Sequence, residues 1–234
     1  MIKTVLFDLD GTLLPMDQET FVKAYFGLLS KKLYPYGFEP KKLIDSVWYG
    51  TAAMIQNNGK CTNEEVFWNV FKKIYGEDVI KYHPIFEEYY KIEFQQVKDV
   101  CGYNILAKKV IEILKQKGKD LVLATNPIFP SVATNSRIKW AGLEKEDFKY
   151  ISTYENSKFC KPNLEYYREI LTKLNLHPEE CLMVGNDVIE DAITSELGIK
   201  VFLLTDNLIN KNNIDITIYP HGSFNELLEY IEQI

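Results

Sequence analysis

Lys3-Thr-Val-Leu-Phe-Asp8-Leu-Asp10-Gly11-Thr12 is the most informative segment of this sequence. Residues 4–7 are β-branched, aromatic or aliphatic, with no breaker and no helical spacing, which predicts a buried strand. Gly11 permits a turn after this strand, and the turn can bring Asp8 and Asp10 around one point. Two adjacent carboxylates do not both ionise readily without a cation, so the pair suits a nucleophile, a proton donor and a bound metal. The alternative is a strand that ends in a solvated acidic turn.

Strands and helices alternate through the second half of the chain, which predicts an α/β fold with a doubly wound, Rossmann-like, mostly parallel sheet. Gly118 and Gly198 are stop signals for two of the helices, and Pro162 favours the first turn of another. The expected strands are residues 120–124, 150–152, 181–184 and 200–204, with 214–219 as a sixth strand at an edge, and the expected helices are 105–117, 163–174 and 188–197.

Residues 15–98 differ, because they lack comparable strand runs and are rich in aromatic residues and lysines. They predict a helical cap inserted after the first strand, so that the catalytic core consists of residues 1–14 and 99–234. Trp48 and Tyr49 lie beside Gly50, and we expect this segment to face the site and help to set specificity. The alternative is an amphipathic helix that buries Trp48. The expected cap helices are residues 17–33, 39–56, 63–75 and 84–97, separated by turn residues.

The composition excludes several classes of protein. The chain has 234 residues and a formal net charge of −6, which argues against binding to nucleic acid or to an anionic membrane surface. Its four cysteines are scattered, and three histidines do not supply a zinc cluster. The first apolar run is too short and too acidic for a signal peptide, and no segment approaches the length of a membrane span. We therefore expect a cytoplasmic protein, whose oligomeric state the sequence does not indicate.

Polar residues follow the other expected strands in the same way. Thr125 and Asn126 follow the run at 120–124, Lys161 follows the run at 150–152, and an Asn186–Asp191 segment follows the run at 181–184. Each of them also has a simpler explanation. Thr125 and Asn126 could form only a polar turn, Lys161 is one lysine among many, with Lys158 nearby as a competitor for its role, and Asp191 could only stabilise a helix N-terminus. Open α/β sheets bind their ligands at the carboxyl ends of the strands, so their shared position predicts one site.

These motifs, in this order, resemble the haloacid dehalogenase superfamily, specifically its phosphatases with a helical cap of the first class. The resemblance covers nearly the whole expected core. The matching segments are Phe7-Asp8-Leu-Asp10-Gly11-Thr12-Leu13, Ala124-Thr125-Asn126, Lys161-Pro162 and Gly185-Asn186-Asp187 through Asp191.

The resemblance implies a role for each matching residue. Asp8 is the nucleophile that forms an aspartyl-phosphate, and Asp10 protonates the leaving group and later activates water. Thr125 bonds the phosphoryl group and Lys161 balances charge. The remaining residues expected to bind substrate are Gly11, Thr12 and Asn126, together with Trp48 and Tyr49 of the cap.

The resemblance also implies a magnesium ion, held by the Asp8 carboxylate, the Asp10 main-chain carbonyl and Asp187. Many members have Gly-Asp where this chain has Gly185-Asn186. We favour Asp187 as the ligand, because a carboxylate compensates a dication better than an amide does. Asn186 and Asp191 are then expected to support the ligands, although Asn186 is an alternative ligand.

The expected activity is a magnesium-dependent phosphatase that hydrolyses phosphomonoesters of small metabolites. Asp10 favours this over dehalogenation, because cleavage of a phosphate ester needs an acid to protonate the leaving group. One alternative is a phosphomutase acting on a sugar phosphate. Another is a phosphoacceptor signalling module or a binding protein without turnover.

Overall fold

The computed structural model describes all 234 residues, and its centre is a six-stranded sheet in the order β3-β2-β1-β4-β5-β6. Every neighbouring pair of strands is parallel. The chain leaves β1 toward β2 on one side and returns to β4 on the other, so the strand order reverses beside β1. The strands are β1 (Thr4–Phe7), β2 (Asp120–Leu123), β3 (Tyr150–Ile151), β4 (Cys181–Gly185), β5 (Lys200–Leu204) and β6 (His221–Gly222).

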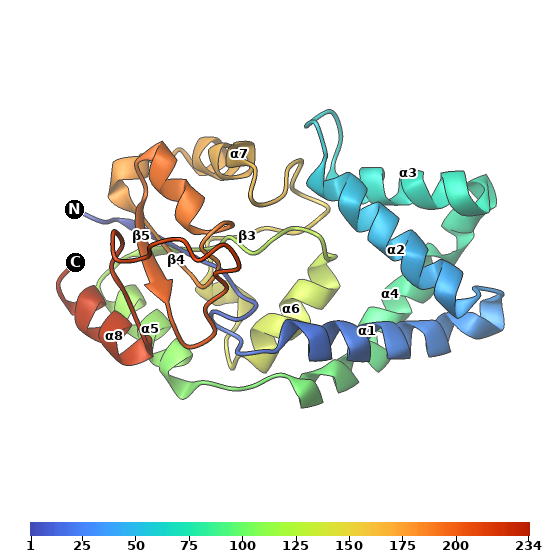
Figure 1. The fold of residues 1–234 in the computed structure, drawn as a ribbon, viewed down its shortest axis with the longest axis horizontal. Coiled ribbons are helices and arrows are strands. Elements are labelled where there is room, and N and C mark those ends of the chain that lie inside the picture. Colours follow the sequence, from blue (N-terminus) through green and yellow to red (C-terminus); the bar gives the residue numbers. More distant parts are fainter.

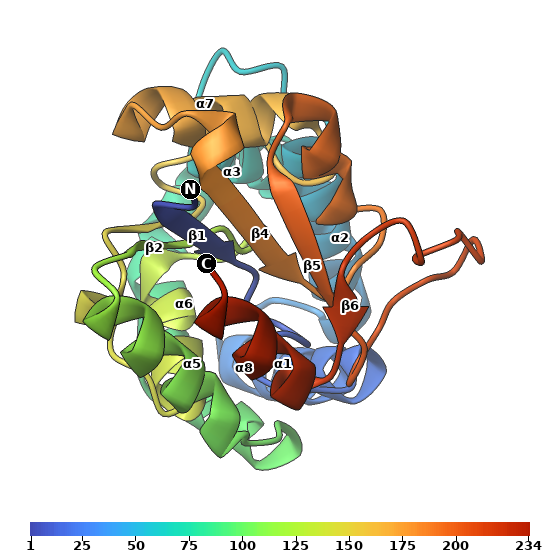
Figure 2. The ribbon, with the colours of Figure 1, turned by 90° about the vertical axis from the view of Figure 1, so that its left-hand side faces the viewer.

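Helices cover both faces of the sheet, as Figure 2 shows. Alternate strand residues point to opposite faces, so Val5 and Phe7 join one hydrophobic cluster and Leu6 joins another. The helices on the first face are α5 (Ile105–Gln116), α6 (Ser131–Trp140) and α8 (Phe224–Glu232), and the second carries α7 (Leu164–Leu174) and a 3-10 helix (Ala192–Leu197). This arrangement confirms the predicted doubly wound α/β fold.

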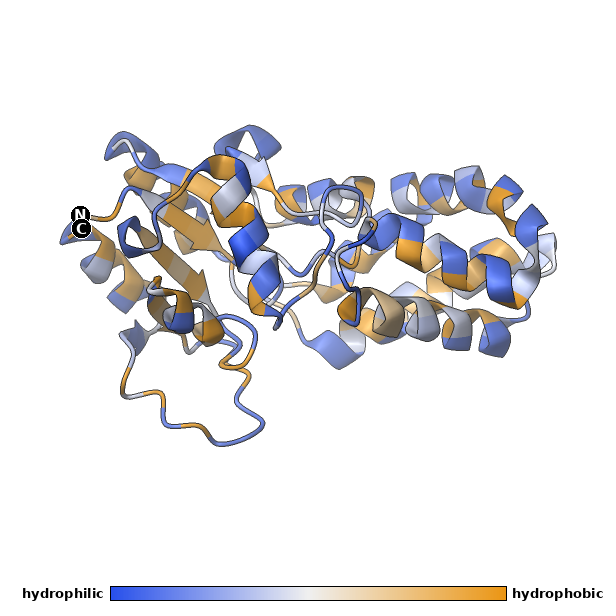
Figure 3. Ribbon diagram, turned by 90° about the horizontal axis from the view of Figure 1, so that it is seen from above, coloured by the Kyte–Doolittle hydropathy of each residue, from blue (hydrophilic) through white to orange (hydrophobic).

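A second group of helices lies between β1 and β2 in the sequence and at the other end of the molecule in space (Figure 1). Thr62 and Glu65 form a capping box that begins the third of these helices at the predicted residue. Hydrophobic residues line the inner sides of the helices, and one buried cluster continues from the sheet into them (Figure 3). The group contains α1 (Gln18–Leu33), α2 (Pro40–Ile55), α3 (Asn63–Tyr75) and α4 (His83–Lys91), with 3-10 segments Tyr34–Tyr36, Glu77–Tyr82 and Glu93–Val100.

The two chain segments that connect this group to the sheet lie side by side. Met16 and Cys101 form an antiparallel bridge, and the amide of Gly102 donates a hydrogen bond of 2.7 Å to the carbonyl of Pro15. The helical segment runs two residues past the predicted limit, to Val100. The division into a core and a cap with limits at 15 and 98 stays a prediction.

The expected edge strand at 214–219 is wrong. These residues belong to the long loop between β5 and β6, which extends away from the body of the protein (Figure 2). Ile214 and Ile218 are exposed, and the Asp215 carboxylate accepts a hydrogen bond of 2.9 Å from the amide of Thr217. A local turn of this kind competes with strand pairing, so the alternating pattern of apolar residues was misleading.

Two expected helices are shorter or tighter than their patterns indicated. The pattern at 84–97 divides at Ile92, whose φ of −117° and ψ of −77° end α4. In the pattern at 188–197, only Ala192–Leu197 is helical, as a 3-10 segment that ends at the predicted Gly198. In the residues before this segment, the carboxylates of Asp187 and Asp191 accept hydrogen bonds from main-chain amides, and no helix forms there. Helices α6 and α8 had not been predicted.

Candidate active site

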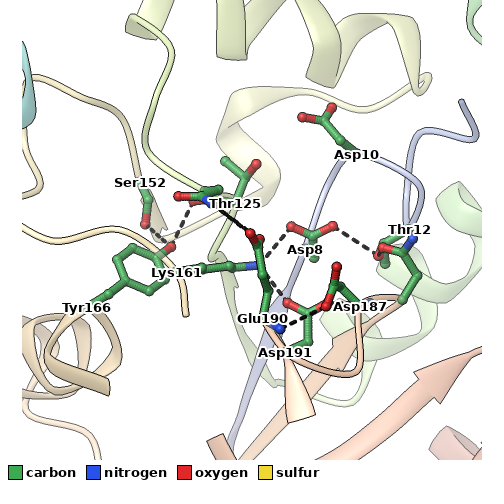
Figure 4. A network of polar contacts seen from close by, with 12 residues as sticks. Asp8, Asp10, Thr12, Thr125, Ser152, Lys161, Tyr166, Asp187, Glu190 and Asp191 are labelled. Atoms are coloured by element: carbon green, nitrogen blue, oxygen red, sulfur yellow. Dashed lines mark hydrogen bonds and ion pairs between the residues drawn. The ribbon is translucent and has the colours of Figure 1, made fainter. Parts of the chain in front are cut away.

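Asp8 directly follows β1 at the centre of the sheet, and its carboxylate is held from two sides (Figure 4). Lys161 Nζ lies 2.8 Å from Asp8 Oδ1, and the Thr12 hydroxyl lies 3.1 Å from Asp8 Oδ2. The residue is 7% exposed and lines a cavity. An anionic carboxylate with a fixed orientation that still reaches a cavity has the geometry of a nucleophile.

Lys161 is fully enclosed and contacts two carboxylates. Its Nζ lies 2.6 Å from Asp191 Oδ1 as well as close to Asp8. Burial by itself would lower the pKa of Lys161, but the charges of Asp191 and Asp8 raise it well above the ordinary value. Burial raises the pKa of Asp191, and Lys161 opposes that shift. Lys161 therefore stays cationic, and Lys158, the competing lysine, is exposed.

Asp10 lies on the turn after β1 and pairs with a residue that sequence reasoning missed. Asp10 Oδ2 contacts Nη1 of Arg137, which comes from α6 and is completely buried. The Arg137 guanidinium also lies 4.4 Å from the centre of the Phe129 ring. Burial raises the pKa of Asp10, Arg137 opposes this, and the charge of Asp8 adds to it. Asp10 Oδ1 has no hydrogen-bond partner, and the residue lines the same cavity as Asp8.

Gly11 and Thr12 shape this turn and are not among the residues that line the cavity, so their expected contact with substrate stays a prediction. Gly11 has a φ of +85°, and a Cβ on it would lie 2.4 Å from Asn186 Nδ2. The Thr12 hydroxyl lies 2.8 Å from Asn186 Oδ1, and Asn186 Nδ2 donates a hydrogen bond of 2.7 Å to the carbonyl of Asn207. Both ends of the Asn186 amide are thus engaged in holding the turn after β1 and the loop after β5.

Asp187 follows β4 and lines the cavity. Its Oδ1 accepts hydrogen bonds from the amides of Ile189 and Glu190 at 2.8 and 2.9 Å, and Asp191 Oδ2 accepts one of 3.0 Å from the amide of Asp187. Asp187 Oδ2 has no hydrogen-bond partner in the protein. Asp191, which the sequence predicted to support the metal ligands, therefore holds both Lys161 and the main chain at Asp187 in position.

The side chains at this edge fit a magnesium ion in the chemistry of their donors. Asp8 and Asp187 supply carboxylates, and the main-chain carbonyl of Asp10 accepts no hydrogen bond from the protein. Magnesium prefers hard oxygen ligands, needs few of them from protein and keeps several waters. No group of three or more His, Cys, Asp or Glu side chains forms a metal cluster, so a site here depends on this smaller set.

Thr125 and Asn126 follow β2, and both line the cavity. The Thr125 hydroxyl makes no hydrogen bond within the protein, whereas Asn126 Nδ2 contacts both carboxylate oxygens of Glu190 at 3.2 and 3.3 Å. Burial raises the pKa of Glu190 to about 7. Tyr166 donates a hydrogen bond of 2.9 Å to the carbonyl of Thr125 and so supports this strand end (Figure 4).

The cavity has a volume of about 370 Å³ and extends from these polar residues toward the inserted helices. Trp48 of α2 lines it and is 49% exposed, so the alternative that its helix buries it is wrong. Tyr49 does not line the cavity and is 65% exposed, so the structure gives no support to the expectation that it contacts substrate. Adjacent residues on a helix point in different directions, so only one of the pair faces the site.

Sequence reasoning missed Arg137 and Glu190. Arg137 lies 127 positions from Asp10 in an unpredicted helix, and nothing local distinguishes it from a solvated arginine. Glu190 stands within the recognised 185–191 segment, so its position after β4 was the available signal.

Comparison with known proteins shows which family the chain belongs to. Residues 2–196 match the haloacid dehalogenase-like hydrolase family. The chain belongs to this family. The haloacid dehalogenase-like chain is 25% identical over 234 residues to a glyceraldehyde 3-phosphate phosphatase from Methanothermobacter thermautotrophicus, with 93% of this chain and 95% of the relative covered. It is also 25% identical over 186 residues to the pyrophosphatase PpaX from Oceanobacillus iheyensis, covering 80% of this chain and 75% of the relative.

Solved structures of the haloacid dehalogenase-like fold resemble the chain over almost its full length. A phosphatase from Thermococcus onnurineus has a TM-score of 0.59 and 20% identity, with 98% of each chain covered. A 2-haloacid dehalogenase from Pseudomonas syringae has a TM-score of 0.61 and 18% identity, with 100% of this chain and 99% of that chain covered. Phosphatase and dehalogenase are thus equally similar in shape, so the similarity concerns the fold and not the reaction. No helix is both long and apolar enough to cross a membrane.

Proposed function

We propose that this hydrolase is a magnesium-dependent phosphatase that cleaves phosphomonoesters of small metabolites through a phosphorylated Asp8. The observation that carries the proposal is the pair Asp8 and Asp10, two carboxylates on one cavity with different environments. Asp8 is paired with Lys161, whereas burial, opposed by Arg137, raises the pKa of Asp10 above the ordinary value for an aspartate. A nucleophile beside a proton donor is what phosphate ester cleavage requires, and dehalogenation has no need for the second acid.

In the first step an Asp8 carboxylate oxygen bonds to phosphorus while the bond from phosphorus to the alcohol oxygen breaks. Asp10 donates its proton to that leaving oxygen. In the second step Asp10 takes a proton from water, the water oxygen bonds to phosphorus, and the bond to Asp8 breaks, so that inorganic phosphate is released. Arg137 holds the Asp10 carboxyl in place for both transfers.

The neighbouring side chains stabilise the charge that these steps create. Lys161 offsets the negative charge of the nucleophile and the transferred group, and the free hydroxyl of Thr125 is available to a phosphoryl oxygen. Asp8, the Asp10 carbonyl and Asp187 would hold magnesium, which when bound supplies positive charge beside the phosphoryl group. Asp187 is the better candidate because it carries charge and a free oxygen, whereas both ends of the Asn186 amide are engaged.

Release of phosphate from ethyl phosphate and other small esters, measured with magnesium and with excess chelator, tests the proposal. We expect turnover only with magnesium, and loss of turnover in Asp8→Asn and Asp10→Asn in proteins that still fold, as shown by an unchanged circular dichroism spectrum. Asp120→Asn, at the opposite end of β2, is the matched control and should keep full activity. Wild-type turnover in Asp8→Asn would show that the nucleophile is wrongly assigned. Interconversion of sugar phosphates without phosphate release would identify a mutase instead.

The two candidates for the metal ligand are separated by magnesium binding measured calorimetrically in the absence of substrate. Asp187→Asn should weaken binding by tenfold or more, at roughly 1.4 kcal/mol per factor of ten. Asn186→Ala should loosen the turn at Gly11 with a smaller effect on affinity. The reverse order of the two effects would make Asn186 the ligand.

A further inference from the structure

The inserted helices give the cavity a wall without charge. The residues of the insertion that line it are hydrophobic, with two polar exceptions, Gln18 and Thr51. The Thr51 hydroxyl is already committed, because it donates a hydrogen bond of 2.9 Å to the carbonyl of Val47. The hydroxyl groups of Tyr25 and Tyr90 lie 2.9 Å apart and share one hydrogen bond. A polar leaving group would find few free partners on this side of the cavity.

Aromatic rings dominate that wall. Phe26 and Trp48 pack with ring centres 5.5 Å apart, Trp68 and Phe86 with centres 5.3 Å apart, and all four line the cavity. Aromatic rings attract a further ring in edge-to-face or offset arrangements, in addition to the gain from removing apolar surface from water. A dry apolar cavity of about 150 Å³ accepts benzene, so the 370 Å³ found here has room for a ring and a phosphoryl group together.

The charges of the cavity lie at its other end. The five acidic residues that line it belong to the strand ends of the core, and its one lining cation is Lys211 in the β5–β6 loop. That loop is tied to the phosphoryl end, because the amide of Ile209 donates a hydrogen bond of 2.8 Å to the carbonyl of Asn186. A second anionic group on the far side of the substrate would therefore have no cation to meet and would be desolvated.

We propose that the substrate is the phosphomonoester of a hydrophobic alcohol, with an aromatic ring as the best fit and no second anionic group. This inference rests on the proposed phosphatase activity and specifies the class of leaving group. The substrate of either curated relative differs in kind, since glyceraldehyde 3-phosphate and pyrophosphate have polar or anionic leaving groups.

The main comparison is between 2-phenylethyl phosphate and ethyl phosphate, whose alcohols have similar acidity, so that intrinsic reactivity does not decide the result for this pair. We expect kcat/KM for 2-phenylethyl phosphate to exceed that for ethyl phosphate by about tenfold or more, the discrimination typical of an added apolar group in a fitting pocket. Glyceraldehyde 3-phosphate, 2-phosphoglycolate and pyrophosphate should fall below 2-phenylethyl phosphate. Calorimetric binding of 2-phenylethylphosphonate and ethylphosphonate should show the same order without turnover.

Two neighbouring residues provide a matched pair of variants. Trp48→Ala removes an aromatic side chain from the cavity wall, and Tyr49→Ala removes one that points elsewhere on the same helix. The preference for the phenylethyl over the ethyl ester should fall about tenfold in Trp48→Ala and stay unchanged in Tyr49→Ala. Thr51→Lys, which places a cation on the apolar wall, should raise the relative kcat/KM for 2-phosphoglycolate.

The results that would overturn this inference differ from those that would overturn the proposed phosphatase activity. Phosphate release that is fastest from 2-phosphoglycolate, glyceraldehyde 3-phosphate or pyrophosphate would overturn this inference and leave the phosphatase activity standing. Equal loss of preference in Trp48→Ala and Tyr49→Ala would also overturn it. If no ester is hydrolysed, the proposed function fails, and the inference about its substrate fails with it.

Discussion

Lys161→Met tests whether the buried ion cluster holds the catalytic edge of the sheet together. Methionine has nearly the volume of lysine but no charge, so Asp8 and Asp191 would face each other without a cation. Their side chains are 10% and 1% exposed, and that of Lys161 is 0% exposed. Breaking a buried ion pair by removing one partner costs about 3–5 kcal/mol. For a chain of this length, such a loss lowers the melting temperature by about 10 °C.

The loss should depend on pH with a definite sign. Burial already raises the pKa of Asp191, and removal of Lys161 removes the charge that opposes this shift. A carboxyl with a raised pKa in the folded state keeps a proton that the unfolded chain has released. The free energy of unfolding therefore falls as the pH rises from about 4 toward the folded pKa. The deficit of Lys161→Met should be largest at pH 8 and should shrink toward pH 5.

Urea unfolding at pH 8 and pH 5 measures both effects. Lys158→Met is the matched control, because this nearby lysine is exposed, and its replacement should change stability by less than about 0.5 kcal/mol. Lys161→Met combined with Asp191→Asn should recover about 2 kcal/mol, since one of the two opposed charges is gone. A Lys161→Met protein within about 1 kcal/mol of wild type at pH 8, or an equal deficit at both pH values, would refute the reasoning.

Three further substitutions have defined outcomes. Burial raises the pKa of Glu190 to about 7, so ionisation of this carboxyl lowers the free energy of unfolding of the wild type as the pH rises. Glu190→Gln removes that loss. Between pH 5 and pH 8, its free energy of unfolding in urea should therefore rise by up to about 3 kcal/mol relative to that of wild type. Arg137→Met leaves Asp10 in a buried site without its cation, and kcat should drop about tenfold or more with little change in KM, in steady-state assays. Asn63→Ala removes hydrogen bonds of 3.2 and 3.3 Å from α3 to two carbonyls of the core, and should cost about 2–3 kcal/mol in thermal unfolding.

Each of these has a contrary result. The same pH dependence in Glu190→Gln and wild type would mean that Glu190 does not titrate between pH 5 and pH 8. Full activity in Arg137→Met would show that Asp10 needs no positioning by its partner. If the exposed control Asn58→Ala destabilises the protein as much as Asn63→Ala does, the contact between α3 and the core is not the cause.

Much of the fold follows from the sequence because its signals are local. Apolar runs such as 4–7 and 181–184 lie where strands form, and helix α3 begins and ends where its capping residues and Gly76 indicate. The apolar pattern was misleading where a side chain makes a local hydrogen bond. At Asp215 and Thr217 such a bond forms a turn in place of the expected strand. The spacing of apolar residues describes what could pack, and does not register such competing hydrogen bonds.

The chemical groups available at the site could be predicted from the sequence alone. It placed Asp8 and Asp10 after the first strand and Thr125, Lys161 and Asp187 after later ones, and parallel strands bring their carboxyl ends to one edge. Which of these groups contact one another depends on the three-dimensional fold. It paired Asp10 with Arg137 across 127 positions, left Gly11 and Thr12 out of the cavity lining, and placed Trp48 but not Tyr49 in that lining. Those outcomes depend on how helices pack onto the sheet and onto each other, which the spacing of residues along one chain does not specify.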